Sequence, residues 1–169
     1  MPLHKVARPA NTARTPAHCQ IMSLLIEKGA DPNARNGIGW SPLHLCVVGG
    51  NIDGIVILLA AGASLGLECN RGLTPLEYYH ENKRVLPMLL RGGAPLPRSS
   101  HARWMDPLYG TYNPTIQRYL AKVAVAGSWA AYEKQHRAHL VRTFVSKFPR
   151  LPPDVIPTIV AFGFHTGDY

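Results

Sequence analysis

Apolar residues recur at helical spacing along residues 1–97, and their runs end in the same way three times. Two large aliphatic residues are followed by two spacer residues and then by Gly-Ala, with the glycines at Gly29, Gly62 and Gly93. Glycine at the end of an apolar run permits the left-handed turn that terminates a helix. The pattern therefore predicts three helices that end at these glycines.

A second phrase opens a helix ahead of each glycine. Its three copies are Pro2-Leu3-His4, Pro42-Leu43-His44 and Pro75-Leu76-Glu77. Proline suits the first helical turn, because its missing N–H has no helical partner there. Each repeat is therefore predicted to hold two helices, which in the middle repeat cover about residues 41–48 and 52–60.

Two places depart from this regular pattern. Pro87 lies inside the last apolar run, so the helix there is expected to start at or just before it, or to kink there. The first repeat is about seven residues too long, and the excess is expected to loop out within residues 8–16.

The spacing of about 33 residues and two local phrases resemble the ankyrin repeat. These phrases are Trp40-Ser41-Pro42-Leu43-His44-Leu45-Cys46 and Gly29-Ala30-Asp31-Pro32-Asn33. The resemblance covers residues 1–97, as repeats 1–35, 36–68 and 69–97, and implies a short all-α solenoid. The first repeat is irregular and could be truncated, since Met1 occupies the slot of the signature threonine. The resemblance to the ankyrin repeat also implies that His4 and His44 hydrogen-bond to neighbouring turns.

The rest of the chain is predicted to be a connector followed by a helical extension. Prolines and a glycine interrupt residues 98–112, whereas residues 113–169 carry three helical patterns. The first helix begins at Asn113-Pro114, the second follows Ser128 over residues 129–147, and a short apolar one lies within 151–162. We expect these helices to form a C-terminal cap on the repeats.

The tail supports a second interpretation. Repeats followed by a helix and Leu151-Pro152-Pro153-Asp154-Val155 are similar to C-terminal extensions of ankyrin proteins from algae and other protists. The same phrase weakly resembles the opening helix of F-box and SOCS-box modules, which would dock a ubiquitin-ligase core. Only 19 residues follow Arg150, too few for a whole F-box. A cap and a docking box both remain open.

The positive charge of the chain is concentrated after the repeats. The formal net charge is +8, and residues 98–150 hold nine Lys or Arg but two Asp or Glu. A basic patch would suit an acidic protein surface, nucleic acid or an anionic membrane, although a solvated basic helix explains it equally well. Its candidate residues are Arg118, Lys122, Lys134, Arg137, Arg142 and Lys147.

The composition of the sequence narrows the choice of cellular compartment. The sequence holds no apolar run long enough to span a membrane. Its three scattered cysteines do not form a disulfide framework, which favours the cytoplasm or nucleus. The first 26 residues carry no acid, which is also typical of an organelle transit peptide.

Repeats of this kind build binding surfaces rather than catalytic clefts, so we predict no enzyme and no cofactor. A metal site is not expected either, because His136 and His139 share a helix but have no further ligands nearby in the sequence. The predicted partner contacts lie at loop tips and on the concave side. They are Arg35, Asn36, Ile38, Trp40, Asn70, Arg71 and Leu73, and Trp40 could instead belong to the core.

The leading functional prediction is a protein-binding adaptor, scaffold or accessory subunit of a larger complex. One alternative is the substrate receptor of a ubiquitin ligase, with the tail as its docking box. A second is a binder of nucleic acid or anionic surfaces through the basic segment, with nucleic acid less favoured than protein.

Overall fold

The computed structural model describes residues 2–7, 16–78, 85–96, 114–152, 154–158 and 160. These residues form helices, turns and loops and contain no strand, so the predicted all-α class is confirmed. Contacts divide the chain into residues 1–112 and 113–169, which we call the repeat unit and the tail unit. None of the described helices is both long and apolar enough to cross a membrane.

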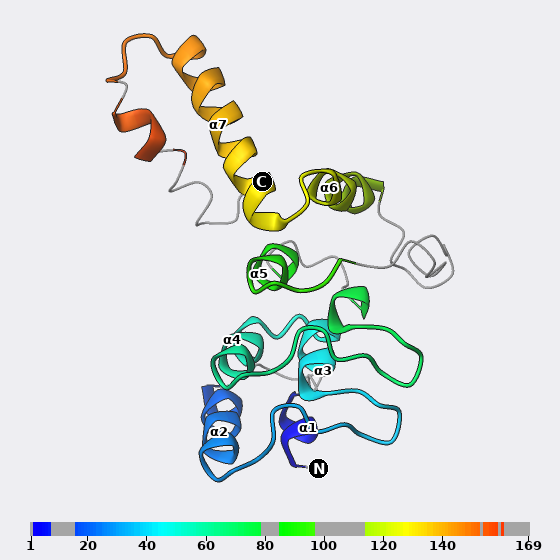
Figure 1. Cartoon of the computed structure of the whole chain (residues 1–169). Coiled ribbons are helices and arrows are strands. Elements are labelled where there is room, and N and C mark those ends of the chain that lie inside the picture. The colour runs from blue at the N-terminus through cyan, green and yellow to red at the C-terminus, as the bar shows by residue number, and fades with distance from the viewer. Residues whose placement is uncertain are drawn as a thin grey trace. The chain divides into compact units, whose positions relative to one another are not determined.

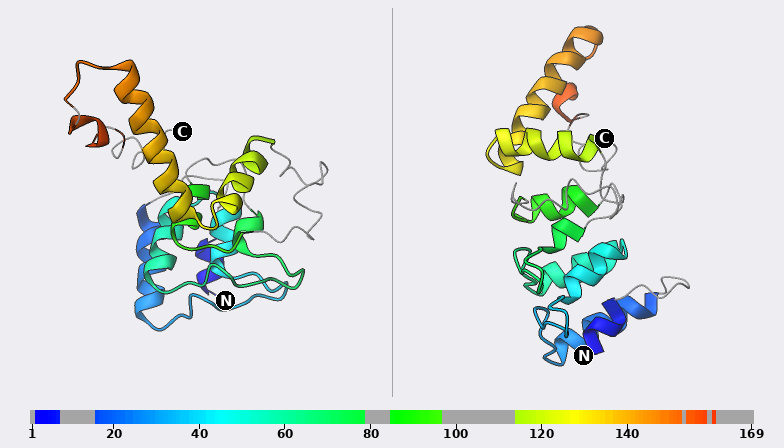
Figure 2. Two further views of the ribbon diagram at one scale, coloured as in Figure 1. Left: turned by 45° about the horizontal axis from the view of Figure 1, so that its top comes forward. Right: turned by 90° about the vertical axis from the view of Figure 1, so that its right-hand side faces the viewer.

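The repeat unit is built from pairs of short helices (Figures 1 and 2). The pairs are α1 (Pro2–Ala7) with α2 (Pro16–Glu27), α3 (Pro42–Val48) with α4 (Ile52–Ala60), and the 3₁₀ helix η1 (Pro75–Tyr78) with α5 (Val85–Arg91). One row consists of α1, α3 and η1, and α2 packs on α4 in a second row. The loops that lead into α3 and η1 project to the same side of these rows (Figure 1).

The predicted helices of the middle repeat are confirmed, and the described residues of α5 start at Val85, two residues before Pro87. The third repeat opens differently from the expected α-helix. Its first described turn is 3₁₀, closed by a hydrogen bond of 3.0 Å from the Glu77 N–H to the Thr74 carbonyl oxygen. The predicted loop in the first repeat and the connector at 98–112 lie outside the described residues, apart from Pro16, which begins α2.

The three Gly-Ala phrases end their helices as predicted. Gly29, Gly62 and Gly93 have φ values of +85°, +82° and +87°. In each case the following alanine N–H bonds back to a leucine carbonyl five residues earlier, at 2.9 Å. This is the hydrogen bond that closes a helix through a left-handed glycine.

His4 and His44 link successive repeats, as the resemblance implied. His4 Nε2 donates to the Trp40 carbonyl at 2.9 Å, and His44 Nε2 donates to the Leu73 carbonyl at 3.2 Å. Nδ1 of His44 also accepts the Ser41 N–H at 3.1 Å. The ring of His44 is fully buried, and this burial lowers its pKa below the ordinary value. These rings therefore fix each loop to the helix of the repeat before it.

The tail unit contains α6 (Pro114–Val125) and α7 (Trp129–Lys147). Ser128 caps α7, since its hydroxyl oxygen accepts the Ala131 N–H at 3.1 Å. Residues 155–158 form a further helical turn. Ile156 and Val160 pack there against a patch of α7 made by Leu140, Val141 and Phe144. That these helices cap the repeats stays a prediction.

Candidate functional site

Two loops of the repeat unit have the same hydrogen-bonded form. In the first, the Asn36 N–H donates to the Trp40 carbonyl at 3.0 Å, and in the second the Cys69 N–H donates to the Leu73 carbonyl at 2.9 Å. We call residues 36–40 the first finger and residues 69–73 the second finger. The Asn36 side chain further stiffens the first finger, because its Oδ1 accepts the N–H groups of Ile38 and Trp40 at 3.1 and 2.9 Å.

The two fingers are also joined to each other. The Asn70 N–H donates to the Ile38 carbonyl at 3.3 Å, and Asn70 Nδ2 donates to the Gly37 carbonyl at 3.2 Å. Arg35 completes the link, since its guanidinium donates to Asn70 Oδ1 at 3.2 Å and to the Gly39 carbonyl at 3.3 Å. The fingers approach so closely that a Cβ at Gly39 would collide with Asn70. Arg35 and Asn70 thus hold the fingers in place.

A groove of about 590 Å³ runs beside the first finger. Its lining residues come from that finger, from α1 and from α3: His4, Lys5, Asn36, Gly37, Ile38, Trp40 and Leu45. Ile38 is 57% exposed at the rim. Trp40 is half-buried, with its ring 4.7 Å from that of Tyr78 and 6.2 Å from that of His44. Trp40 therefore packs on neighbouring rings and also lines the groove, and its role as a partner contact stays a prediction.

Of the seven predicted contacts, Asn36, Ile38 and Trp40 line this groove. Arg71 is exposed on the second finger. Leu73 is the exception, because its side chain is 3% exposed and belongs to the core. Its carbonyl is held by His44 and its side chain contributes no open surface.

Sequence reasoning missed Lys5 and Leu45 as groove residues. Both directly follow a Pro-Leu-His phrase, and Tyr78 follows Pro-Leu-Glu in the third repeat. The sequence therefore contained a signal for these positions, namely the residue that follows each repeated phrase. The residue after each phrase lies on the first helix of its repeat and, in α1 and α3, borders the groove.

The predicted basic residues all belong to α6 and α7. Arg118, Lys122, Lys134, Arg142 and Lys147 are exposed. Arg137 instead forms a salt bridge of 2.7 Å with Glu133, one helical turn away. Within the described part of the chain, no group of three or more His, Cys, Asp or Glu side chains is arranged to hold a metal ion.

Stacked helix pairs with projecting fingers define a helical repeat protein. A family model described as ankyrin repeats in many copies matches residues 10–59. The chain therefore contains ankyrin repeats, which are generally protein–protein interaction modules.

Curated proteins from a plant, a bacterium and a mammal are similar to part of this chain. The ADP-ribosylation factor GTPase-activating protein AGD4 of Arabidopsis thaliana is 42% identical over 57 residues, covering 34% of this chain and 7% of its own length. A Rickettsia bellii protein whose name describes ankyrin repeats is 34% identical over 73 residues, or 40% of this chain and 30% of its own. The 2-5A-dependent ribonuclease of Mus musculus is 44% identical over 52 residues, or 30% of this chain and 7% of its own.

These relatives are similar to this chain only over a small part of their own length. The activities in two of their names are therefore statements about those proteins. The family match ends at residue 59, and none of these findings supports the ubiquitin-ligase alternative for the tail.

Proposed function

We propose that this chain is a non-enzymatic adaptor or scaffold, or an accessory subunit of a larger complex, that binds a protein partner through its first finger. The observation that carries the proposal is the groove beside Ile38 and Trp40. Ile38 is exposed there, and the backbone of the first finger is hydrogen-bonded both within the finger and to Asn70 of the second finger. A partner would thus meet a surface that needs little ordering on binding, which reduces the entropic cost of association.

The chemistry of the groove favours a partner segment with an apolar anchor beside an acidic group. Ile38, Trp40 and Leu45 supply apolar surface, whereas Lys5 supplies an exposed ammonium group. Arg35 and Arg71 are exposed on or beside the fingers and add positive charge. Apolar anchors contribute most of the affinity in such interfaces, and the charges set orientation and association rate.

We also propose that the chain lies inside the cell. Cys19, Cys46 and Cys69 are unpaired thiols, which are expected in a reducing compartment. Burial raises the pKa of Cys46 to about 12, so this thiol stays protonated and acts as a small core residue.

The test compares two exposed aliphatic residues of the repeat unit. Ile38 is 57% exposed at the groove and Val56 is 52% exposed on α4, outside the groove lining. Proteins captured from cells by the full chain are quantified for the wild type, Ile38→Asp and Val56→Asp. The variant Ile38→Asp should weaken binding of the true partner by about 30-fold or more, as loss of an interface anchor does. Val56→Asp should retain it.

A third variant tests the hydrogen bonds that join the two fingers rather than the exposed surface. Asn70→Ala removes the side-chain bonds to Gly37 and Arg35. It should also lower affinity, because the first finger then has to be ordered on binding. If all three variants bind every captured protein like the wild type, the finger is not the binding site and the proposal is wrong.

A further inference from the structure

The far end of α7 and the turn after it form an exposed bend in the tail unit. We call residues 145–152 the tail tip, and every one of them is exposed. Beyond the tail tip the chain folds back, since Ile156 and Val160 pack on an earlier part of α7 (Figure 1). The tail tip is therefore the bend between two packed segments, with its side chains in solvent.

Large apolar side chains gather in the tail tip. Val145, Phe148 and Leu151 are 45%, 49% and 37% exposed, and they are three of the nine exposed large hydrophobic residues in the described part of the chain. The ring of Phe148 is held by that of Phe144, with centroids 5.6 Å apart. A group of exposed apolar residues on a folded chain marks an interaction surface.

Positive charge surrounds these apolar side chains. Lys147 and Arg150 belong to the tail tip, which contains no Asp or Glu, and the exposed Arg142 lies one helical turn before Val145. Asp154 is the nearest acidic residue in the sequence and follows the tail tip. No salt bridge between described residues involves the three cationic side chains, so their charge is available to an anionic ligand.

The backbone of the tail tip presents few unpaired donors. The Phe148 N–H donates to the Phe144 carbonyl at 2.8 Å, and the Leu151 N–H donates to the Phe148 carbonyl at 3.0 Å. Pro149 and Pro152 have no N–H at all. An N–H without a partner is costly in an apolar medium. This turn can therefore leave water at a low cost, which suits contact with lipid.

We propose that the tail tip binds to the surface of an anionic lipid bilayer. Val145, Phe148 and Leu151 would enter the boundary between headgroups and acyl chains, where apolar and aromatic side chains are favoured. The long side chains of Lys147 and Arg150 would stay at the level of the headgroups and attract their anionic groups.

A bilayer fits the tail tip better than a nucleic acid does. A phosphate backbone is neutralised by a series of cations along its length, whereas the tail tip supplies Lys147 and Arg150 between apolar side chains. A bilayer accepts both kinds of side chain, because its anionic headgroups lie directly above an apolar layer. Lipids can also rearrange around an exposed bend, whereas a protein partner would need a matching cavity.

The experiment measures co-sedimentation of the full chain with vesicles of phosphatidylcholine, either alone or with about one-third phosphatidylserine. The anionic vesicles should bind the chain about tenfold or more tightly than the neutral ones, since each nearby Lys or Arg adds a factor of about five. Binding should weaken as the NaCl concentration rises from about 0.1 M to about 0.5 M, because salt screens exposed charges.

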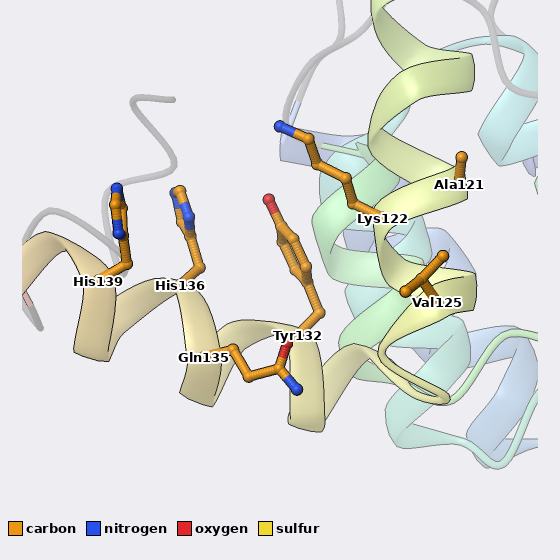
Figure 3. A pocket seen from close by; sticks show the side chains of 7 residues that line it. All are labelled: Ala121, Lys122, Val125, Tyr132, Gln135, His136 and His139. Carbon is orange, nitrogen blue, oxygen red and sulfur yellow. The ribbon is translucent and has the colours of Figure 1, made fainter.

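Substitutions at the apolar positions separate insertion from attraction between charges. Phe148→Asp and Leu151→Asp should each weaken binding to the anionic vesicles by about tenfold or more. Phe148→Leu keeps an apolar side chain and should retain binding. The matched control is Val125→Asp, because Val125 is 90% exposed on α6, outside the tail tip (Figure 3). This control changes the net charge equally and should bind like the wild type.

Two double variants locate the cationic contribution. Lys147→Gln with Arg150→Gln should weaken binding to the anionic vesicles by about tenfold or more. Lys122→Gln with Lys134→Gln removes the same charge from exposed positions outside the tail tip and should nearly retain binding. Lys134 lies about 20 Å before Lys147 along α7, beyond the range of strong interaction at physiological salt.

Four results would overturn the proposal. The first is equal binding to neutral and anionic vesicles, the second is a Phe148→Asp variant that binds like the wild type, and the third is an equal loss in the two double variants. The fourth is tighter binding of an oligothymidylate than of the anionic vesicles, which would identify nucleic acid as the ligand. None of these results depends on the first finger, so the adaptor proposal and this one can fail separately.

Discussion

At the residue scale, His44 contributes stability that depends on pH. Because burial lowers its pKa in the folded state, the unfolded chain takes up a proton more readily. Its contribution is therefore complete above its ordinary pKa of 6.5 and is lost as pH falls below that value. We expect the free energy of unfolding, measured with urea, to decline from about pH 7 to about pH 5, and His44→Gln to flatten that decline.

The same variant should be less stable than the wild type by about 2–3 kcal/mol at neutral pH. It leaves the buried Ser41 N–H and Leu73 carbonyl without their partner, and unpaired buried groups carry a desolvation cost. The matched control is His139→Gln, an exposed histidine of α7. An unchanged pH slope in His44→Gln would mean that another group is responsible.

Residue identity could be read from the sequence where a repeated phrase states the role of a side chain. The phrases predicted that His4 and His44 tie the repeats together. They did not show which finger residues point outward, because that depends on neighbouring repeats. Leu73 was predicted at the surface, yet the hydrogen bond from His44 to its carbonyl holds this residue against the core. Lys5 and Leu45 were overlooked although their equivalent positions were visible.

At the element scale, the left-handed glycines determine where the helices end. Gly62 has a φ of +82°, and a Cβ added there would meet nothing within 4 Å, so only backbone strain opposes alanine. Gly62→Ala should therefore destabilise the repeat unit by about 1–2 kcal/mol in thermal or urea unfolding. Gly29→Ala should cost the same, because its φ of +85° and empty surroundings are equivalent.

Gly37→Ala is the matched control. This residue also has nothing within 4 Å but lacks a positive φ. The substitution should be neutral or stabilising by about 0.4–1 kcal/mol, since it restricts the unfolded chain. Equal effects at Gly37 and Gly62 would contradict the assigned helix ends.

Helix ends were predictable because a glycine after an apolar run acts through its own backbone. The 3₁₀ turn that starts the third repeat could not be predicted in this way. Its phrase reads like the others, but Glu77 replaces histidine and accepts both the N–H and the hydroxyl of Thr74, at 2.7 and 3.1 Å. The described turn is 3₁₀, and Tyr78 packs its ring on Trp40 of the preceding finger. Such a contact between repeats leaves no periodic signal in the sequence.

At the scale of the whole molecule, the division into two units predicts that a core substitution in one unit increases local unfolding in that unit and not in the other. Ile55 is fully buried in α4, which packs on both α3 and α2, so Ile55→Ala should cost about 2–4 kcal/mol and affect the neighbouring repeats. Ile156 is 1% exposed and packs on α7, so Ile156→Ala should act within the tail unit.

Hydrogen exchange read by mass spectrometry would distinguish these patterns in the full chain. Ile55→Ala should raise exchange in α2, α3 and α4 while α7 keeps its protection, and Ile156→Ala should do the reverse. The exposed Val56→Ala, next to Ile55, should change neither region. If Ile55→Ala instead raised exchange in α7 as strongly as in α2, the repeats and the tail would unfold together. The two units would then be coupled, since a partner that stabilised one unit would also stabilise the other.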